Sequence, residues 1–190
     1  MSDNVDSYGD ANPYGRINYM SPGDGIMEIR RIAETKSGGK GKRLYKVEGV
    51  CIEHTSPDGT QGPHALGDAI ENAWKITPNA EDTDWQAKND HGRIAAFNAT
   101  VLVPMFLASI DDDPRSEGYD PQNKRKRFKG AQRALISDKQ PVRGLLLRYS
   151  ARKPKSTGKF VDVVFEMIPG QTPESIKARR AAADAGQRPQ

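Results

Sequence analysis

Apolar side chains recur along the chain with the period of a strand, then of a helix, then of a strand again. Residues 26–32 and 44–53 are short, rich in β-branched side chains and bounded by glycine-rich turns, which predicts a hairpin of two strands. Residues 44–53 carry apolar side chains on both parities, which indicates a strand covered on both sides or one with a bulge. Residues 66–76 suit either a helix or a strand, and we favour a third strand.

The apolar period changes after this third strand. Ile94, Phe97 and Val101 follow i, i+3, i+7 spacing, which predicts a helix. Asp90 is an acceptable N-cap, so we expect the helix to begin near it. Pro104 lacks the N–H that a helical ladder needs, and we expect it to end or kink this helix.

Strand periodicity returns in the last third of the chain. Residues 142–149 and 160–168 predict two further strands joined by a basic turn. A short helix is expected at 131–136, before these strands. Another is expected after Thr172, where Pro173 suits the first helical position.

This order of three strands, a helix and two strands has few compact arrangements. A five-stranded Greek-key barrel with a helix between strands three and four, the OB-fold, fits it best, so the predicted class is all-β with accessory helices. An α+β sheet with one helix is the alternative. The barrel core is expected to contain Ile29, Val47, Val50, Ile52, Phe97, Val101, Leu145, Leu147, Val163 and Phe165.

The expected OB-fold domain spans residues 25–170 and includes a basic insertion at 111–138. Residues 1–24 lack periodicity and are rich in Asp, Asn, Gly and Tyr, which predicts a flexible N-terminal arm. Residues 171–190 are expected to form the terminal helix and a tail.

The formal net charge of +4 conceals a strong segregation of charge along the chain. Residues 26–52 carry a net +4, residues 53–113 a net −8 and residues 115–159 a net +11. Basic surfaces of this kind attract polyanions. Acidic and basic parts that neutralise each other on a solvated surface are the other interpretation.

The composition removes support from several classes of protein. The longest apolar run is far shorter than the ~18 residues of a membrane helix, so no membrane partner is expected. Cys51 is the single cysteine and the three histidines lie far apart, which argues against an internal disulfide and against a Cys/His zinc site. Phosphate-loop, serine-hydrolase and zinc-protease motifs are absent, so we expect no enzyme, no cofactor and no metal. The polar, acidic start of the chain lacks a secretory pattern, and a cytoplasmic location is expected.

The two hairpins and the segments between them share a loose set of motifs. These are residues 25–53, the segment from Gly67 to Trp74, the helix with Phe97, and a closing hairpin from Pro141 through the loop Ser156-Thr157-Gly158-Lys159-Phe160 to Phe165. Over roughly residues 22–170 the chain resembles phage-encoded OB-fold single-stranded DNA-binding proteins. The resemblance implies sequence-tolerant binding of single-stranded DNA in phage replication or recombination, in the cytoplasm of a host cell. It also implies replication proteins as partners. Single-stranded DNA-binding proteins of the bacterial kind recruit such partners through an acidic tip, whereas this chain ends Arg188-Pro189-Gln190, so the resemblance does not extend to that tip.

A single strand is held by cations along its backbone and by aromatic rings that stack on its bases. We therefore expect the binding groove on the two basic hairpins. The candidate cations are Arg30, Arg31, Lys36, Lys40, Lys42, Arg43, Lys46, Arg143, Arg148, Arg152, Lys153, Lys155 and Lys159. The candidate stacking rings are Tyr45, Trp74, Tyr149 and Phe160, and a place in the core is the alternative for Trp74.

Two other functions compete with this hypothesis. A virion structural or assembly protein would use the basic hairpins to contact an acidic neighbour. A metal-dependent nuclease would use carboxylates such as Glu48, Glu53, Asp68 and Glu71, and the run Asp111 to Asp113 is a separate alternative for a metal site or a solubilising loop. RNA and duplex DNA are weaker expected ligands than single-stranded DNA, and an exposed sheet edge or the N-terminal arm would allow a homo-oligomer.

Overall fold

The computed structural model describes residues 19–36, 43–60, 62–76, 85–102, 132–153 and 161–186. The predictions for most of the N-terminal arm, for most of the basic insertion and for the two hairpin loops lie outside these residues. The run of basic residues from Lys124 to Lys129 and the acidic triplet from Asp111 to Asp113 lie outside them as well.

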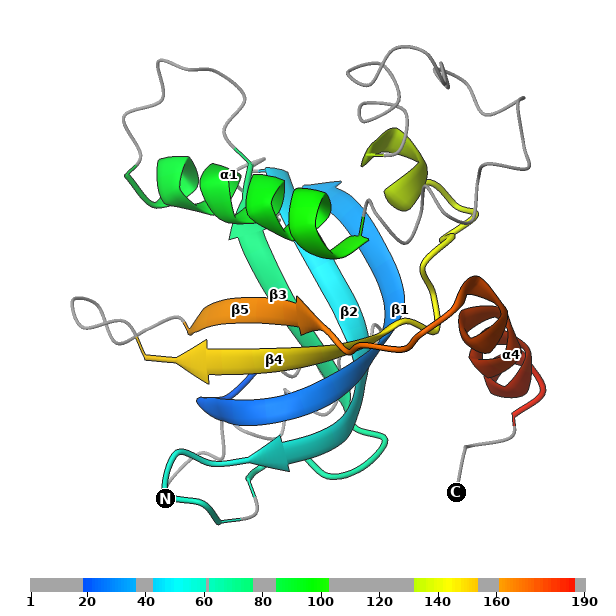
Figure 1. Ribbon diagram of the computed structural model, residues 1–190. Coiled ribbons are helices and arrows are strands. Elements are labelled where there is room, and N and C mark those ends of the chain that lie inside the picture. The colour runs from blue at the N-terminus through cyan, green and yellow to red at the C-terminus, as the bar shows by residue number, and fades with distance from the viewer. Residues whose placement is uncertain are drawn as a thin grey trace, which may run out of the picture.

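The protein is mostly β, with one five-stranded antiparallel sheet and a few helices (Figure 1). The strands are β1 (Gly23–Lys36), β2 (Arg43–Thr55), β3 (Ala69–Lys75), β4 (Leu146–Arg152) and β5 (Asp162–Met167). Their order across the sheet is β3-β2-β1-β4-β5. The five strands expected from the apolar pattern are present, and residues 66–76 do contain the favoured third strand.

β1 is long enough to pair with two neighbours in different ways. It pairs with β2 from Asp24 to Lys36 but with β4 only from Gly23 to Glu28. Register shifts interrupt the β1–β2 ladder after Ile26 and after Ile29, and the first leaves Ile52 of β2 without a register partner. Bulges bend a strand and increase its twist. β4 and β5 consequently cross β2 and β3 at a steep angle, as Figure 1 shows.

Most of the predicted core residues are buried, and two are not. Ile29, Val47, Phe97, Val101, Leu145, Leu147, Val163 and Phe165 are in the core. Val50 and Ile52 are only half-buried. Val50 lies on the same side of β2 as Lys46 and Glu48, and Ile52 occupies the bulge, so neither faces the interior.

The structure corrects two predictions for the first helix and one for the fourth strand. α1 (Trp85–Phe97) begins five residues before Asp90, and it continues as the π-helical segment η2 (Asn98–Leu102). Asp90 is not the cap: its side chain accepts a hydrogen bond from the backbone N–H of Lys75 at 2.9 Å. The strand predicted from residue 142 begins only at Leu146, because residues 141–144 form turns that end at Gly144, with a φ of 93°.

The terminal helix is placed as predicted. α4 (Pro173–Asp184) has Thr172 as its N-cap, and the side chains of Thr172 and Ser175 each accept a hydrogen bond from the other residue's backbone N–H. Ile176 is its buried residue, and Arg179 Nε donates to the carbonyl oxygen of Gly144 at 2.7 Å. The expected short helix before β4 covers residues 132–135. None of the helices in the described part of the chain is long and apolar enough to cross a membrane.

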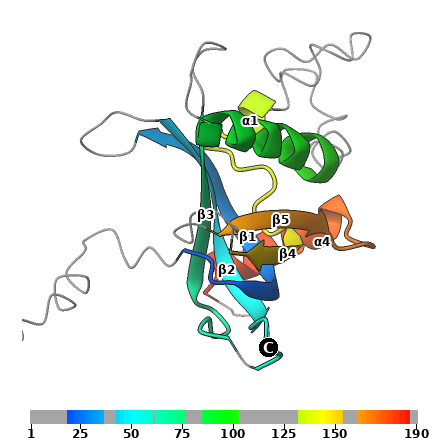
Figure 2. The ribbon, with the colours of Figure 1, turned by 90° about the vertical axis from the view of Figure 1, so that its left-hand side faces the viewer.

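α1 lies across one end of the curved sheet and connects its two edge strands (Figures 1 and 2). Asp90 holds the end of β3 through Lys75, and it also pairs with Arg93 at 2.9 Å. Arg93 in turn pairs with Asp162 at the start of β5 at 2.8 Å. Across the described residues no backbone ladder joins β3 to β5, so barrel closure is not shown.

Candidate nucleic-acid interface

The two basic hairpins lie at opposite ends of β1. Lys36 pairs with Arg43 at the end of the β1–β2 hairpin, whereas Gly23 pairs with Ala151 close to the end of the β4–β5 hairpin. At ~3.3 Å per residue, the 14 residues of β1 separate these ends by at most about 45 Å. A ligand that touches both hairpins therefore has to run along the sheet rather than sit in one compact pocket.

Five of the nine predicted cations that the structure describes are already in ion pairs. These pairs are Arg30 with Glu28, Arg43 with Glu34, Lys46 with Glu71, Arg143 with Asp184, and Arg152 with Asp24. The hydrogen bonds from Arg152 hold the pKa of Asp24 below its ordinary value. A paired cation can reach a phosphate only by leaving its carboxylate, so these five contribute less to binding than their number suggests.

Four predicted cations are exposed and form no ion pair among the described residues. Arg31 and Lys36 belong to β1, and Arg148 and Lys153 lie on or just beyond β4. Each hairpin thus keeps two free positive charges for an anionic ligand. The predicted cations Lys40, Lys42, Lys155 and Lys159, together with the ring of Phe160, lie outside the described residues.

The stacking role predicted for three aromatic rings does not fit their positions, because a base can stack only on an open ring face. Tyr45 is 4% exposed, Trp74 4% and Tyr149 1%. Trp74 packs between Phe97 of α1 and Phe165 of β5, with ring centroids 5.5 and 5.8 Å away. The predictions that Phe97 and Phe165 are core residues are confirmed.

The two tyrosines use their hydroxyl groups inside the protein. Tyr45 donates to Asn98 Oδ1 at 2.7 Å, and the hydroxyl of Tyr149 lies 2.7 Å from Nδ1 of His54. Burial raises the pKa of both hydroxyls well above the ordinary value for tyrosine, so both stay protonated. Both buried tyrosines therefore have a structural role, and Tyr45 also borders a pocket.

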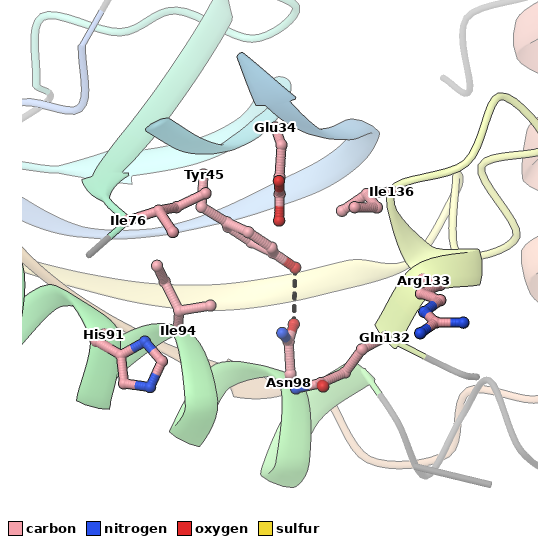
Figure 3. Close-up of a pocket in the computed structure, with 9 residues that line it drawn as sticks. All are labelled: Glu34, Tyr45, Ile76, His91, Ile94, Asn98, Gln132, Arg133 and Ile136. Carbon is pink, nitrogen blue, oxygen red and sulfur yellow. Dashed lines mark hydrogen bonds between the residues drawn. The ribbon is translucent and has the colours of Figure 1, made fainter. Parts of the chain in front are cut away.

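A pocket of about 350 Å³ opens beside the end of the β1–β2 hairpin (Figure 3). It is lined by Glu34, Tyr45, Ile76, His91, Ile94, Asn98, Gln132, Arg133 and Ile136. α1 and η2 supply three of these residues at i, i+3, i+7 spacing, and the short helix at 132–135 borders the opposite wall. Of the lining residues, only Tyr45 is among the predicted site residues, because the pocket joins segments far apart in the sequence.

A polar cluster of buried side chains lies at the other end of β1 from the pocket. The rings of His54 and His64 meet edge-on with centroids 4.9 Å apart, and His64 Nε2 accepts a hydrogen bond from the backbone N–H of Ser21 at 3.0 Å. Burial lowers the pKa of both imidazoles, so both are neutral near pH 7. The same burial raises the pKa of the neighbouring Cys51 thiol, which makes it a poor nucleophile. His54 and His64 are ten positions apart on either side of a turn, and no spacing motif in the sequence predicts their contact.

Neither the pocket nor the histidine cluster forms a metal site. No group of three or more His, Cys, Asp or Glu side chains within the described ranges is arranged to hold a metal ion. Four of the carboxylates considered, Glu48, Glu53, Asp68 and Glu71, are among those residues, and Glu71 is already paired with Lys46 at 3.2 Å. No protein-family model matches the chain, and no curated protein matches it. What the described surface offers is free positive charge on two hairpins and a pocket beside one of them.

Proposed function

We propose that this protein binds single-stranded DNA without sequence preference, as a non-catalytic module of the OB-fold type. The strand order β3-β2-β1-β4-β5, with α1 between β3 and β4, supports the fold assignment because it is the order of an OB barrel opened between β3 and β5. OB-folds are partly open barrels that bind oligonucleotides with strands two and three and with the loops of the two hairpins.

One observation supports the proposed binding of single-stranded DNA. Each hairpin presents two exposed cations that have no carboxylate partner among the described residues, Arg31 and Lys36 on one and Arg148 and Lys153 on the other. Both hairpin connections add further lysines in the sequence. An OB-fold contacts single-stranded nucleic acid through these loops, and their positive charge suits its phosphate backbone.

Burial of the three predicted rings changes how the strand would be held. Stacking contributes ~1–3 kcal/mol per base where a ring is open to the ligand. Without those rings, the phosphate contacts supply most of the affinity, so binding depends strongly on salt. RNA and duplex DNA bind more weakly under this proposal, and a place in phage replication rests on the resemblance of the hairpins alone.

The test is a fluorescence-anisotropy titration of a labelled oligo-dT at low salt, with duplex DNA and RNA titrated in parallel. The double variants Arg31→Ala/Lys36→Ala and Arg148→Ala/Lys153→Ala should each bind the oligo-dT more weakly than the wild type. Lys139→Ala/Lys177→Ala is the matched control, since it also removes two exposed cations and neither lies on a hairpin. No binding of oligo-dT, or equal losses in the control and the double variants, would refute the proposed function.

A further inference from the structure

The pocket beside the β1–β2 hairpin has a specific internal construction. Figure 3 shows the Tyr45 ring extending from β2 toward the start of η2, where its hydroxyl lies against the Asn98 side chain. Ile76 and Ile94 lie on one side of this contact, and Ile136 lies on the other. Apolar walls with a few convergent polar groups are typical of sites for small organic groups.

The Tyr45–Asn98 hydrogen bond determines what the pocket presents to a ligand. Asn98 Oδ1 accepts from the tyrosine hydroxyl at 2.7 Å, so the Nδ2 amide is the end that can donate to a ligand. Asn98 is 3% exposed, which restricts the rotation of its amide. It is also the first residue of the π-helical segment η2, and π-helical turns occur frequently at functional sites.

Size and charge narrow the class of ligand. The volume of about 350 Å³ is at the small end of the range for small-molecule sites and accommodates a single heterocycle. The Glu34 carboxylate on the wall, although paired with Arg43, disfavours a free anion inside. Gln132 supplies a second amide, and amides recognise the hydrogen-bonding edges of nucleobases. The exposed Arg133 of the lining suits the phosphate attached to such a base.

We propose that this pocket holds one base of the bound single strand, with Asn98 Nδ2 donating to the base edge and the isoleucines against its faces. This inference rests on the proposed binding of single-stranded DNA. A base in a single strand is already unpaired, so turning it into a pocket costs less than it would in a duplex. The pocket thereby supplies a base contact that the buried rings of Trp74 and Tyr149 cannot provide.

The test compares two oligonucleotides of equal length and charge, one of thymidines and one in which every base is replaced by an abasic site. The wild type should bind the abasic oligonucleotide about tenfold more weakly, and Asn98→Asp should bind the two about equally. This substitution keeps the oxygen that accepts from Tyr45 and removes the amide donor. Ala95→Asp adds the same charge on an exposed part of α1 outside the pocket and should keep the wild-type preference.

Each outcome separates the two proposals. If the wild type binds both oligonucleotides equally, the pocket does not hold a base although single-strand binding stands. If it binds neither, both proposals are wrong. If Asn98→Asp and Ala95→Asp lose the preference equally, charge rather than the amide is responsible and the inference fails. Should Asn98→Asp not fold, Gln132→Leu at the half-buried edge of the pocket must reduce the preference instead.

Discussion

The indole of Trp74 on β3 meets the ring of Phe165 on β5 edge-on, with centroids 5.8 Å apart, although these strands lie at opposite ends of the sheet order. Phe97 of α1 completes the contact and lies 5.1 Å from Phe165. The two edges of the sheet are therefore held together by side chains and by α1. Trp74 stabilises this arrangement from inside, where no nucleic-acid base can reach it.

Removal of the Trp74 side chain should cost stability rather than affinity. Trp74→Ala leaves a large cavity among buried rings, and such substitutions cost about 3–5 kcal/mol. Chemical denaturation should show this loss, while Trp74→Phe, which keeps a ring, should lose much less. An oligo-dT affinity that falls sharply in Trp74→Phe while its stability is nearly unchanged would instead mark the indole as a ligand contact.

Tyr45→Phe isolates the hydroxyl that orients Asn98. The substitution leaves the buried Asn98 Oδ1 without its donor, which should lower stability by about 1–3 kcal/mol. It should also reduce the preference for base-bearing over abasic oligonucleotides, because the hydroxyl no longer selects which end of the Asn98 amide faces the pocket. Thermal unfolding and anisotropy measure the two effects; an unchanged base preference would mean that Asn98 needs no fixed orientation.

Stability should decrease as the pH falls below about 6.5, the ordinary pKa of histidine. Burial lowers the pKa of His54 and His64 in the folded state, so the unfolded chain binds more protons in this range. Stability is then complete above the unfolded pKa and is lost as the pH falls from it toward the folded values. Protonation of His64 at Nε2 would also remove the acceptor for Ser21.

Denaturation between pH 8 and pH 5 checks this dependence. Asp24, whose pKa is lowered by Arg152, contributes its pH dependence near and below the ordinary carboxyl pKa of 3.8, so it does not account for losses near pH 6. His64→Gln can still offer an acceptor to Ser21 without titrating, and it should flatten the curve. A stability that is constant over this range in the wild type would contradict the assigned burial of the two histidines.

Two glycine-to-alanine substitutions should change the stability of the protein in opposite directions. A Cβ at Gly25 would lie 2.2 Å from the Glu53 carbonyl oxygen and 2.5 Å from the Tyr149 hydroxyl, so Gly25→Ala should destabilise the junction of β1, β2 and β4. A Cβ at Gly92 in α1 meets nothing within 4 Å, and Gly92→Ala should stabilise the protein by about 0.5–1 kcal/mol. Urea midpoints compare the two; a tolerated Gly25→Ala would show that these strands are packed less closely.

The apolar pattern was sufficient to locate the strands, but it did not show which side chains of each strand point into the core. Both parities of residues 44–53 are apolar, so the pattern cannot decide whether Tyr45 or Leu44 faces inward. The sheet places Tyr45, Val47 and Cys51 inside. On the other parity Ile52 lies in the bulge, and Leu44 and Val50 are half-buried on the opposite face. Alternation with Leu147 indicates the buried position of Tyr149, whereas its basic neighbour Arg148 faces the other way.

The candidate site was less predictable because it depends on contacts between distant segments. Arg152 forms an ion pair with Asp24, which lies 128 positions earlier in the chain. Counting charges along the sequence cannot reveal that these two charges neutralise each other. The pocket likewise joins β1, β2, α1, η2 and the helix at 132–135, each of which contributes only one or two lining residues. Local patterns predict elements, whereas the free charges and the cavity follow from how the elements pack.

The salt dependence of oligo-dT binding tests the central claim most directly. For single strands, the logarithm of the binding constant falls with the logarithm of salt concentration by about 0.7 per neutralised phosphate. The four hairpin cations that form no ion pair among the described residues therefore predict a slope of about −2.8 or steeper, and each double variant should reduce its magnitude by about 1.4. A slope near zero, or a slope unchanged in both double variants, would contradict the account.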